Sequence, residues 1–161
     1  MQKGLLCLDL GTHTGWARTC DIGEGTFITS GVEDFSGSRF DGGGVRYLKF
    51  KTFLLNAIGF NGGVFRVFYE GVQAHTAVYA AQTYGGFMAT LTSLCEELRI
   101  PYEGVPVGTI KKYMTGNGRA SKDAMVEAVS KRLGKRVHDH NEADALAILF
   151  YASEMIERGR L

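Results

Sequence analysis

Gly4-Leu5-Leu6-Cys7-Leu8-Asp9 is an uninterrupted apolar run that ends in a carboxylate. Without polar alternation, a run of this length predicts a strand whose sheet is covered on both faces. An acid at the end of a buried strand is costly unless it is paired or holds a metal ion. The stretch therefore predicts an α/β sheet and places a candidate functional carboxylate at one strand end.

Two further acids are expected near Asp9. Glu70 closes the apolar run of residues 64–70, and Asp144 lies in the opening turn of a helix predicted from residue 141. A crossover connection would place the strand ending at Glu70 beside the strand ending at Asp9, and the last helix would pack across the same edge. Three close carboxylates raise one another's pKa, and Mg²⁺ relieves their repulsion. The set predicts a metal site for in-line displacement at phosphorus.

Taken singly, two of the three acids have simpler interpretations. Asp9 could cap its own turn, and Asp144 could interact with the helix dipole without any metal. Glu70 follows Val-Phe-Tyr and has no turn role. The metal-site hypothesis therefore depends on the combination.

The rest of the chain predicts a strand meander followed by alternating helices and strands. Strands are expected at residues 5–9, 16–20, 25–32, 64–70 and 101–105, and helices at 45–58, 79–99, 107–114, after the N-cap Ser121, and at 141–158. Residues 37–44 are rich in Gly and Ser and predict a loop. This order favours a five-stranded mixed sheet with helices on both faces, the ribonuclease-H-like topology.

Composition is that of a globular protein. We expect a single domain over residues 1–161, with 45% apolar and 22% charged residues. No apolar stretch reaches the length of a membrane span, and the first strand begins too early for a signal peptide. Cys7, Cys20 and Cys95 share no close spacing and predict thiols in a reducing compartment. We therefore expect a cytoplasmic location.

Charge is distributed unevenly along the chain. Residues 108–136 contain eight basic and two acidic side chains, a local charge of +6, which leaves −5 on the remainder of a chain whose net charge is +1. A positive field of this kind suits a polyanion such as nucleic acid, although a solvated helical surface explains it equally well.

Several segments resemble the RuvC family of Holliday-junction resolvases. Residues 4–17 resemble its opening strand and turn, with the first metal-binding acid at Asp9, and Glu70 matches the second acid. Residues 107–122, ending Gly116-Asn117-Gly118-Arg119-Ala120-Ser121-Lys122, resemble its Gly-x-Gly-x-Ala-x-Lys segment. Residues 141–148 resemble its closing helix. The similarity extends over nearly the whole chain.

The resemblance implies a homodimer that binds four-way DNA junctions and nicks two strands symmetrically with one or two Mg²⁺ or Mn²⁺ ions per subunit. It implies that the metal ligands are Asp9, Glu70, Asn141 and Asp144. Lys111 or Lys112, together with Lys122, would neutralise charge on the scissile phosphate or simply anchor DNA. The expected DNA-binding residues are Lys111, Lys112, Arg119, Lys122, Gln73 and His75. The host would be a bacterial or phage-infected cell.

The chain departs from the family pattern at two places. Asn141 occupies a position where the family commonly has an acid or a histidine, and its carbonyl brings no charge to a metal. His138, His140 and Glu142 are nearby substitutes; His140 is the expected catalytic helper, and Glu142 is expected to point away. The segment between residues 70 and 82 is shorter than in bacterial members, where it supports junction opening by an aromatic wedge. Candidates for that role here are Gln73, His75 and Tyr79.

Other classes of protein share parts of this pattern. Sugar-kinase and actin-like ATPases also begin with Asp-Leu-Gly-Thr, but they need two such domains around a nucleotide. A ribonuclease-H-like enzyme acting on RNA or on other branched DNA would carry the same carboxylates. Because Asn141 removes one charge, a catalytically weak junction-binding protein is a further alternative.

Overall fold

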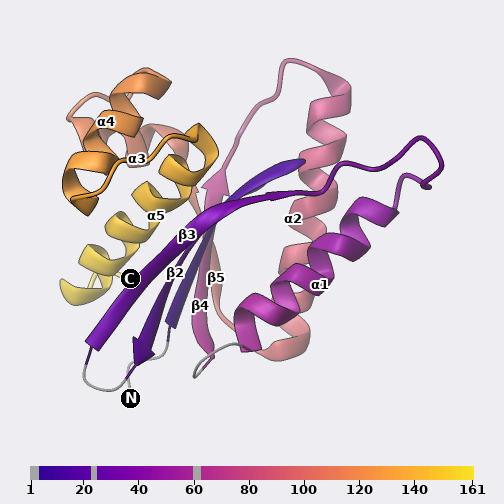
Figure 1. Cartoon of the computed structure of the whole chain (residues 1–161), viewed down its shortest axis with the longest axis horizontal. Helices are drawn as coiled ribbons and strands as arrows, with labels where there is room; N and C mark the ends of the chain where they lie inside the picture. The colour runs from indigo at the N-terminus through magenta and orange to yellow at the C-terminus, as the bar shows by residue number, and fades with distance from the viewer. Residues whose placement is uncertain (1–3, 23–24, 60–62) are drawn as a thin grey trace.

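A five-stranded mixed sheet forms the centre of the molecule (Figure 1). The computed structural model describes residues 4–22, 25–59 and 63–161. The strands in chain order are β1 (Gly4–Asp9), β2 (His13–Ile22), β3 (Gly25–Asp34), β4 (Val64–Gly71) and β5 (Tyr102–Pro106). In space they are ordered β3-β2-β1-β4-β5, with β2 antiparallel to its two neighbours and β4 parallel to β1 and β5.

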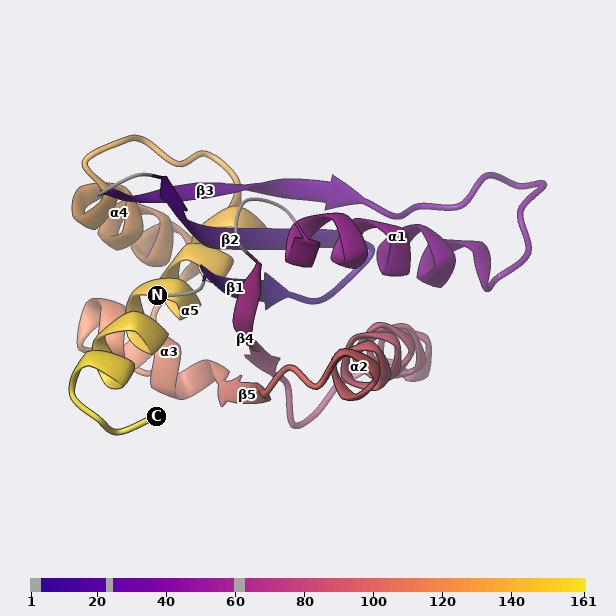
Figure 2. The same cartoon turned by 90° about the horizontal axis from the view of Figure 1, so that it is seen from below.

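Helices cover both faces of this sheet. The helices are α1 (Val45–Gly59), α2 (Val78–Leu98), α3 (Val107–Thr115), α4 (Lys122–Leu133) and α5 (His140–Glu157). Figure 2 shows α1 and α2 on one side of the sheet and the other three on the opposite side. Within the described residues, no helix combines the length and apolar character needed to cross a membrane.

Alternate residues of β1 face the two helical layers. Leu6 and Leu8 belong to the core formed with α1 and α2, whereas Leu5 and Cys7 belong to the core formed with α5. Because both faces of β1 are buried, every position before Asp9 must be apolar or small. The predicted fold class and the two-sided burial of this strand are confirmed.

Several element boundaries differ from the prediction. Strand β2 begins at His13 and β3 continues to Asp34, because these two residues pair in the antiparallel ladder beyond the apolar part of the pattern. Helix α5 begins at His140, after the N-cap Asp139. The Asp139 carboxylate accepts hydrogen bonds from the backbone N–H groups of Asn141 and Glu142 at 2.7 and 3.2 Å. Backbone hydrogen bonds therefore extend the strands and the helix beyond the residues whose apolar pattern predicted them.

The spacing of Asp139 and Glu142 is typical of a capping box, but Glu142 makes a different contact. Its carboxylate accepts a 2.7 Å hydrogen bond from Ser30 Oγ on β3, and so ties the start of α5 to the sheet. Glu142 thus bonds to a side chain of the sheet, and not to the backbone N–H of Asp139 as a capping box would require.

Gly15 on β2 allows α5 to approach the sheet closely. A Cβ atom at this position would overlap the backbone carbonyl of Asn141. Since backbone on both sides of the contact is fixed by secondary structure, neither can move away cheaply. Gly15 therefore sets the position of the first turn of α5.

We predict that Gly15→Ala destabilises the protein by about 1–3 kcal/mol, because overpacking forces α5 away from β2. Thermal unfolding checks this, since 1 kcal/mol corresponds to about 2–4 °C in Tm at this chain length. Gly85→Ala is the matched control. Gly85 lies inside α2 with open space where a Cβ atom would be, so alanine there is expected to add about 0.5–1 kcal/mol of stability. Equal behaviour of the two variants would contradict the close-contact explanation.

Candidate active site

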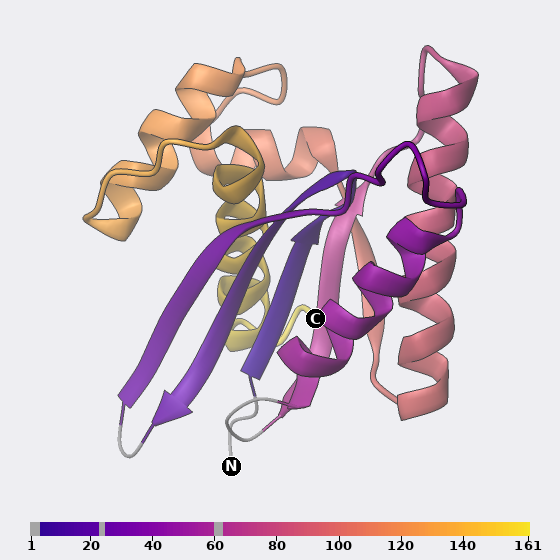
Figure 3. The same cartoon turned by 45° about the vertical axis from the view of Figure 1, so that its right-hand side comes forward.

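The first two predicted acids lie at the ends of adjacent parallel strands. Asp9 is the last residue of β1, and Glu70 is the last but one of β4. The register pairs Leu8 with Tyr69, so the next residue along each strand brings Asp9 beside Glu70. Figure 3 shows both strands finishing at the same end of the sheet.

The third acid, Asp144, lies on α5. Asp9 pairs with Gly15 across β1 and β2, and the first turn of α5 rests on Gly15. Asp144 follows Asn141 by three residues and therefore lies about one helical turn beyond this contact. Its carboxylate is half-buried and interacts electrostatically with both Asp9 and Glu70. The structure thus brings together the three acids that the sequence analysis selected.

Burial and mutual repulsion shift the protonation of all three groups. Burial, followed by the charges of Glu70 and Asp144, raises the pKa of Asp9 well above its usual range. Burial and the charge of Asp144 also raise the pKa of Glu70, and burial raises that of Asp144. Asp9 and Glu70 share a side-chain hydrogen bond that favours the proton on Asp9. One proton held between two carboxylates relieves part of the repulsion.

Two of the predicted lysines belong to this cluster. The charges of Lys111 on α3 and Lys122, the first residue of α4, lower the pKa values of Glu70 and Asp144. Lys122 also lowers the pKa of Asp9. Lys112 and Arg119 are exposed, and the backbone N–H of Arg119 donates to Asn117 Oδ1 at 2.9 Å. Of the adjacent pair on α3, Lys111 is the lysine whose charge acts on the acids.

His140 lies between the acids and a groove along α4. Its charge lowers the pKa of Asp144, while its Nε2 is 4.0 Å from Asp123 Oδ1 on α4. The groove, about 720 Å³, is lined by α4 and the segment that follows it, with Lys131, Lys135, Arg136 and His138 beside Asp123 and Glu127. His138 therefore lines the groove with the basic side chains, and Glu142 points to Ser30 as expected.

The donor set suits a hard cation, although the ligands are not arranged as a finished cage. In the described ranges no three His, Cys, Asp or Glu side chains stand in an arrangement ready to hold one ion. Asp9 and Glu70 are hydrogen-bonded to each other instead. Clustered carboxylates with raised pKa values fit Mg²⁺ or Mn²⁺, because a divalent cation would take the place of the shared proton.

The segment that follows β4 holds the remaining predicted residues. Gln73 is exposed, Tyr79 is 68% exposed, and the His75 ring packs 5.0 Å from the Tyr84 ring. The Tyr84 hydroxyl donates to the Glu70 carbonyl at 2.7 Å and accepts from the Val72 N–H at 3.2 Å. Tyr84 thus fixes the backbone that presents Glu70.

Three supporting residues were missed by sequence reasoning. Gly15, Ser30 and Tyr84 each act through a contact distant in sequence: with Asn141, Glu142 and Glu70 respectively. None of them carried a clear signal: Gly15 falls just before the strand predicted at residues 16–20, and the structure places it inside β2, where a glycine often marks a close backbone approach.

A mixed sheet of this order, with acids at the ends of its adjacent parallel strands, defines the ribonuclease-H-like class of fold. No protein-family model matches the chain, and no curated protein sequence matches it. Solved structures do.

The chain is similar to the Thermus thermophilus RuvC structure, with a TM-score of 0.80 and 20% identity over 98% of this chain and 97% of that one. It is similar to T. thermophilus RuvC in complex with Holliday junction substrate, with a TM-score of 0.81 and 19% identity over 99% and 98% of the two chains. The yeast mitochondrial Holliday junction resolvase Ydc2 matches with a TM-score of 0.59 and 14% identity over 89% and 75%. At these identities the likeness establishes the fold.

The raised acid pKa values predict how metal-free stability depends on pH. The folded protein binds these protons more tightly than the unfolded chain, so their stabilising contribution is complete below the unfolded pKa of about 4 and is lost as pH rises through the folded values. In EDTA at pH 7.5, Asp9→Asn should therefore have a higher Tm than the wild type, and the difference should shrink towards pH 4.

Asp34→Asn is the control for this comparison, because hydrogen bonds from Ser36 lower the pKa of the exposed Asp34. It should not raise the Tm at pH 7.5. A lower Tm for Asp9→Asn in EDTA would contradict the inference that charge repulsion at Asp9 destabilises the metal-free protein.

Proposed function

We propose that this chain is a structure-selective, metal-dependent DNA endonuclease that resolves four-way junctions by paired symmetric nicks. One observation carries the proposal: three half-buried carboxylates with raised pKa values, two at strand ends and one on α5, lie beside two lysines in a fold similar to that of RuvC bound to a Holliday junction. A single nuclease domain over residues 1–161 would perform this reaction.

The acids, lysines and His140 would have distinct roles in this reaction. Asp9, Glu70 and Asp144 would hold one or two Mg²⁺ or Mn²⁺ ions, with Asn141 contributing a neutral carbonyl ligand. Such ions, when bound, supply an activated water and stabilise the leaving oxygen. Lys111 and Lys122 would orient the scissile phosphate and neutralise its charge. His140, whose charge already acts on Asp144, would hold or move a proton near that acid.

Branched DNA is the proposed substrate and partner. Lys112, Arg119, Gln73 and His75 would contact its backbone outside the acid cluster. One arm of the junction would lie along the α4 groove, where Lys131, Lys135 and Arg136 outnumber Asp123 and Glu127. Paired nicks need two sites, so the active form would be a homodimer. The three cysteines are buried free thiols, which supports a cytoplasmic location in a bacterial or phage-infected cell.

Cleavage assays with matched linear, forked, four-way and RNA–DNA hybrid substrates in Mn²⁺ test this function. We expect paired nicks in the four-way junction, and we expect Asp9→Asn to reduce the rate by about 10²–10⁴-fold with junction binding retained, because a lost metal ligand removes several kcal/mol of transition-state stabilisation. Equal cleavage of linear duplex and junction would refute junction selectivity. Preferred cleavage of the hybrid would favour an RNA-directed enzyme.

Asn141 supports a second candidate, a junction-binding protein with weak catalysis, because it leaves the metal site with one charge fewer. We expect Asn141→Asp to lower the Mg²⁺ concentration needed for half-maximal nicking, since an added carboxylate strengthens the site. His140→Ala is the companion variant. If Asn141→Asp changes nothing and His140→Ala is inactive, the role belongs to His140; binding without nicking in either metal would identify the weak binder.

A further inference from the structure

The loop between β3 and α1, residues 36–44, presents an aromatic side chain to solvent. Among the large apolar side chains of the described ranges, Phe40 is the most exposed, at 84%. The guanidinium of its neighbour Arg39 lies over the ring, with Cζ 4.7 Å from the ring centroid. A single exposed apolar residue is ordinary on a protein surface. Phe40 differs from such a residue in three ways: Arg39 lies over its ring, hydrogen bonds order its loop, and the loop lies at the acid end of the sheet.

Hydrogen bonds within the loop order its tip. The backbone N–H of Ser38 donates to Asp41 Oδ2 at 2.8 Å, and the N–H of Asp41 donates back to the Ser38 carbonyl at 3.1 Å. Lys49 Nζ on α1 lies 3.8 Å from the same Asp41 oxygen. The Phe40 N–H donates to Ser38 Oγ at 3.2 Å. A closed turn therefore presents the ring.

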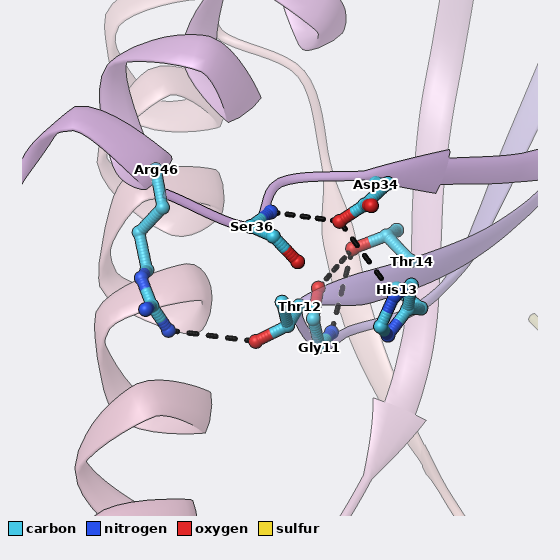
Figure 4. Close-up of polar contacts among 7 residues, drawn as sticks. All are labelled: Gly11, Thr12, His13, Thr14, Asp34, Ser36 and Arg46. Atoms are coloured by element: carbon cyan, nitrogen blue, oxygen red, sulfur yellow. Dashed lines mark hydrogen bonds and ion pairs between the residues drawn. The ribbon is translucent and has the colours of Figure 1, made fainter. Parts of the chain in front are cut away.

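Both ends of the loop are tied to the turn that follows Asp9. The backbone N–H of Phe35 donates to the Thr12 carbonyl at 2.8 Å, and Arg46 Nη1 donates to Thr12 Oγ1 at 3.4 Å. Figure 4 shows Arg46 reaching across from α1 to this turn. The Phe35 ring is buried against the rings of Phe50 and Phe87, at 5.4 and 5.9 Å. The stem is thus built into the hydrophobic core.

This anchoring places the loop at the acid end of the sheet but away from the lysines. In Figure 3 the loop, the start of α5 and the ends of β1 and β4 lie at the same end of the molecule. In Figure 2 the loop extends on the side of α1 and α2, opposite α3 and α4. DNA that contacts the lysines of α3 and α4 and crosses the acids would therefore continue towards the loop.

An aromatic ring and a guanidinium are the two groups on which nucleobases stack. In continuous duplex each base face is covered by its neighbours, so free base faces occur where a duplex branches or opens. We propose that the Arg39–Phe40 tip is a base-stacking site for unstacked bases of branched DNA. The proposal rests on the proposed function and adds the element that distinguishes a branch from a linear duplex.

The segment after β4 is less suited to this role. Gln73 has no ring, and His75 already packs on Tyr84. Tyr79, on the first turn of α2, is the remaining exposed ring at 68%. It therefore serves as the rival in the test.

Binding of a four-way junction with 2-aminopurine at the branch point tests the proposal. The protein carries Asp9→Asn to prevent cutting, and the linear duplex of the same sequence is measured in parallel. We expect Phe40→Ala to weaken junction binding about 5- to 150-fold, to remove the 2-aminopurine fluorescence change on binding, and to leave duplex binding unchanged. Phe40→Trp should retain junction affinity, and Arg39→Lys, which keeps the charge without the planar group, should lose part of it.

Phe27→Ala is the matched control, since Phe27 is a 53% exposed ring at the opposite end of β3 and should have no effect. Unchanged junction affinity and fluorescence in Phe40→Ala, or an equal loss on linear duplex, would overturn the stacking role. A selective loss in Tyr79→Ala with none in Phe40→Ala would overturn it in favour of α2. If the Asp9→Asn parent binds no junction, the proposed function fails first, and that result differs from a binding parent with an inert Phe40.

Discussion

The contact between Gly15 and the backbone at the start of α5 is the constraint on which the site depends. Asp9 and Glu70 become neighbours through the parallel pairing of β1 with β4, which the core of the sheet secures. Asp144 is different, because it comes from a helix that must be packed closely on the face of β1 and β2. The absence of a side chain at Gly15, together with the bond from Ser30 to Glu142, holds that helix in place.

The lysines offset the charge of the acids incompletely, and this incompleteness has a chemical consequence. Lys111 and Lys122 act on the cluster, but three carboxylates face two ammonium groups, and the pKa values stay raised. In the metal-free protein the proton shared by Asp9 and Glu70 takes up part of the remaining charge. A site fully neutralised by lysines would attract a cation weakly. The remaining negative charge costs stability and favours metal binding.

Sequence patterns predicted the strand ends well because they follow from local chemistry. An apolar run closed by an acid identified Asp9 and Glu70, and helix periodicity identified the helix that carries Asp144. The supports could not be predicted in the same way. Tyr84 and Ser30 act across the fold, and their partners are set by the packing of whole elements. Helix orientation likewise decides which of Lys111 and Lys112 faces the acids, and two adjacent lysines look alike in sequence.

The turn between β1 and β2 joins the parts of the molecule that the proposed reaction uses. Asp9 and Gly15 flank it, Thr14 Oγ1 donates to the Gly11 carbonyl at 2.6 Å to close it, and Thr12 holds both ends of the β3–α1 loop. The same few residues therefore position Asp9, hold α5 close to the sheet and support the loop that carries Phe40. Because these contacts share one short segment, a shift of its backbone would move all of them together. In the proposed reaction, one short piece of chain would therefore support both the stacking of bases on Phe40 and the cutting of the backbone at the acids.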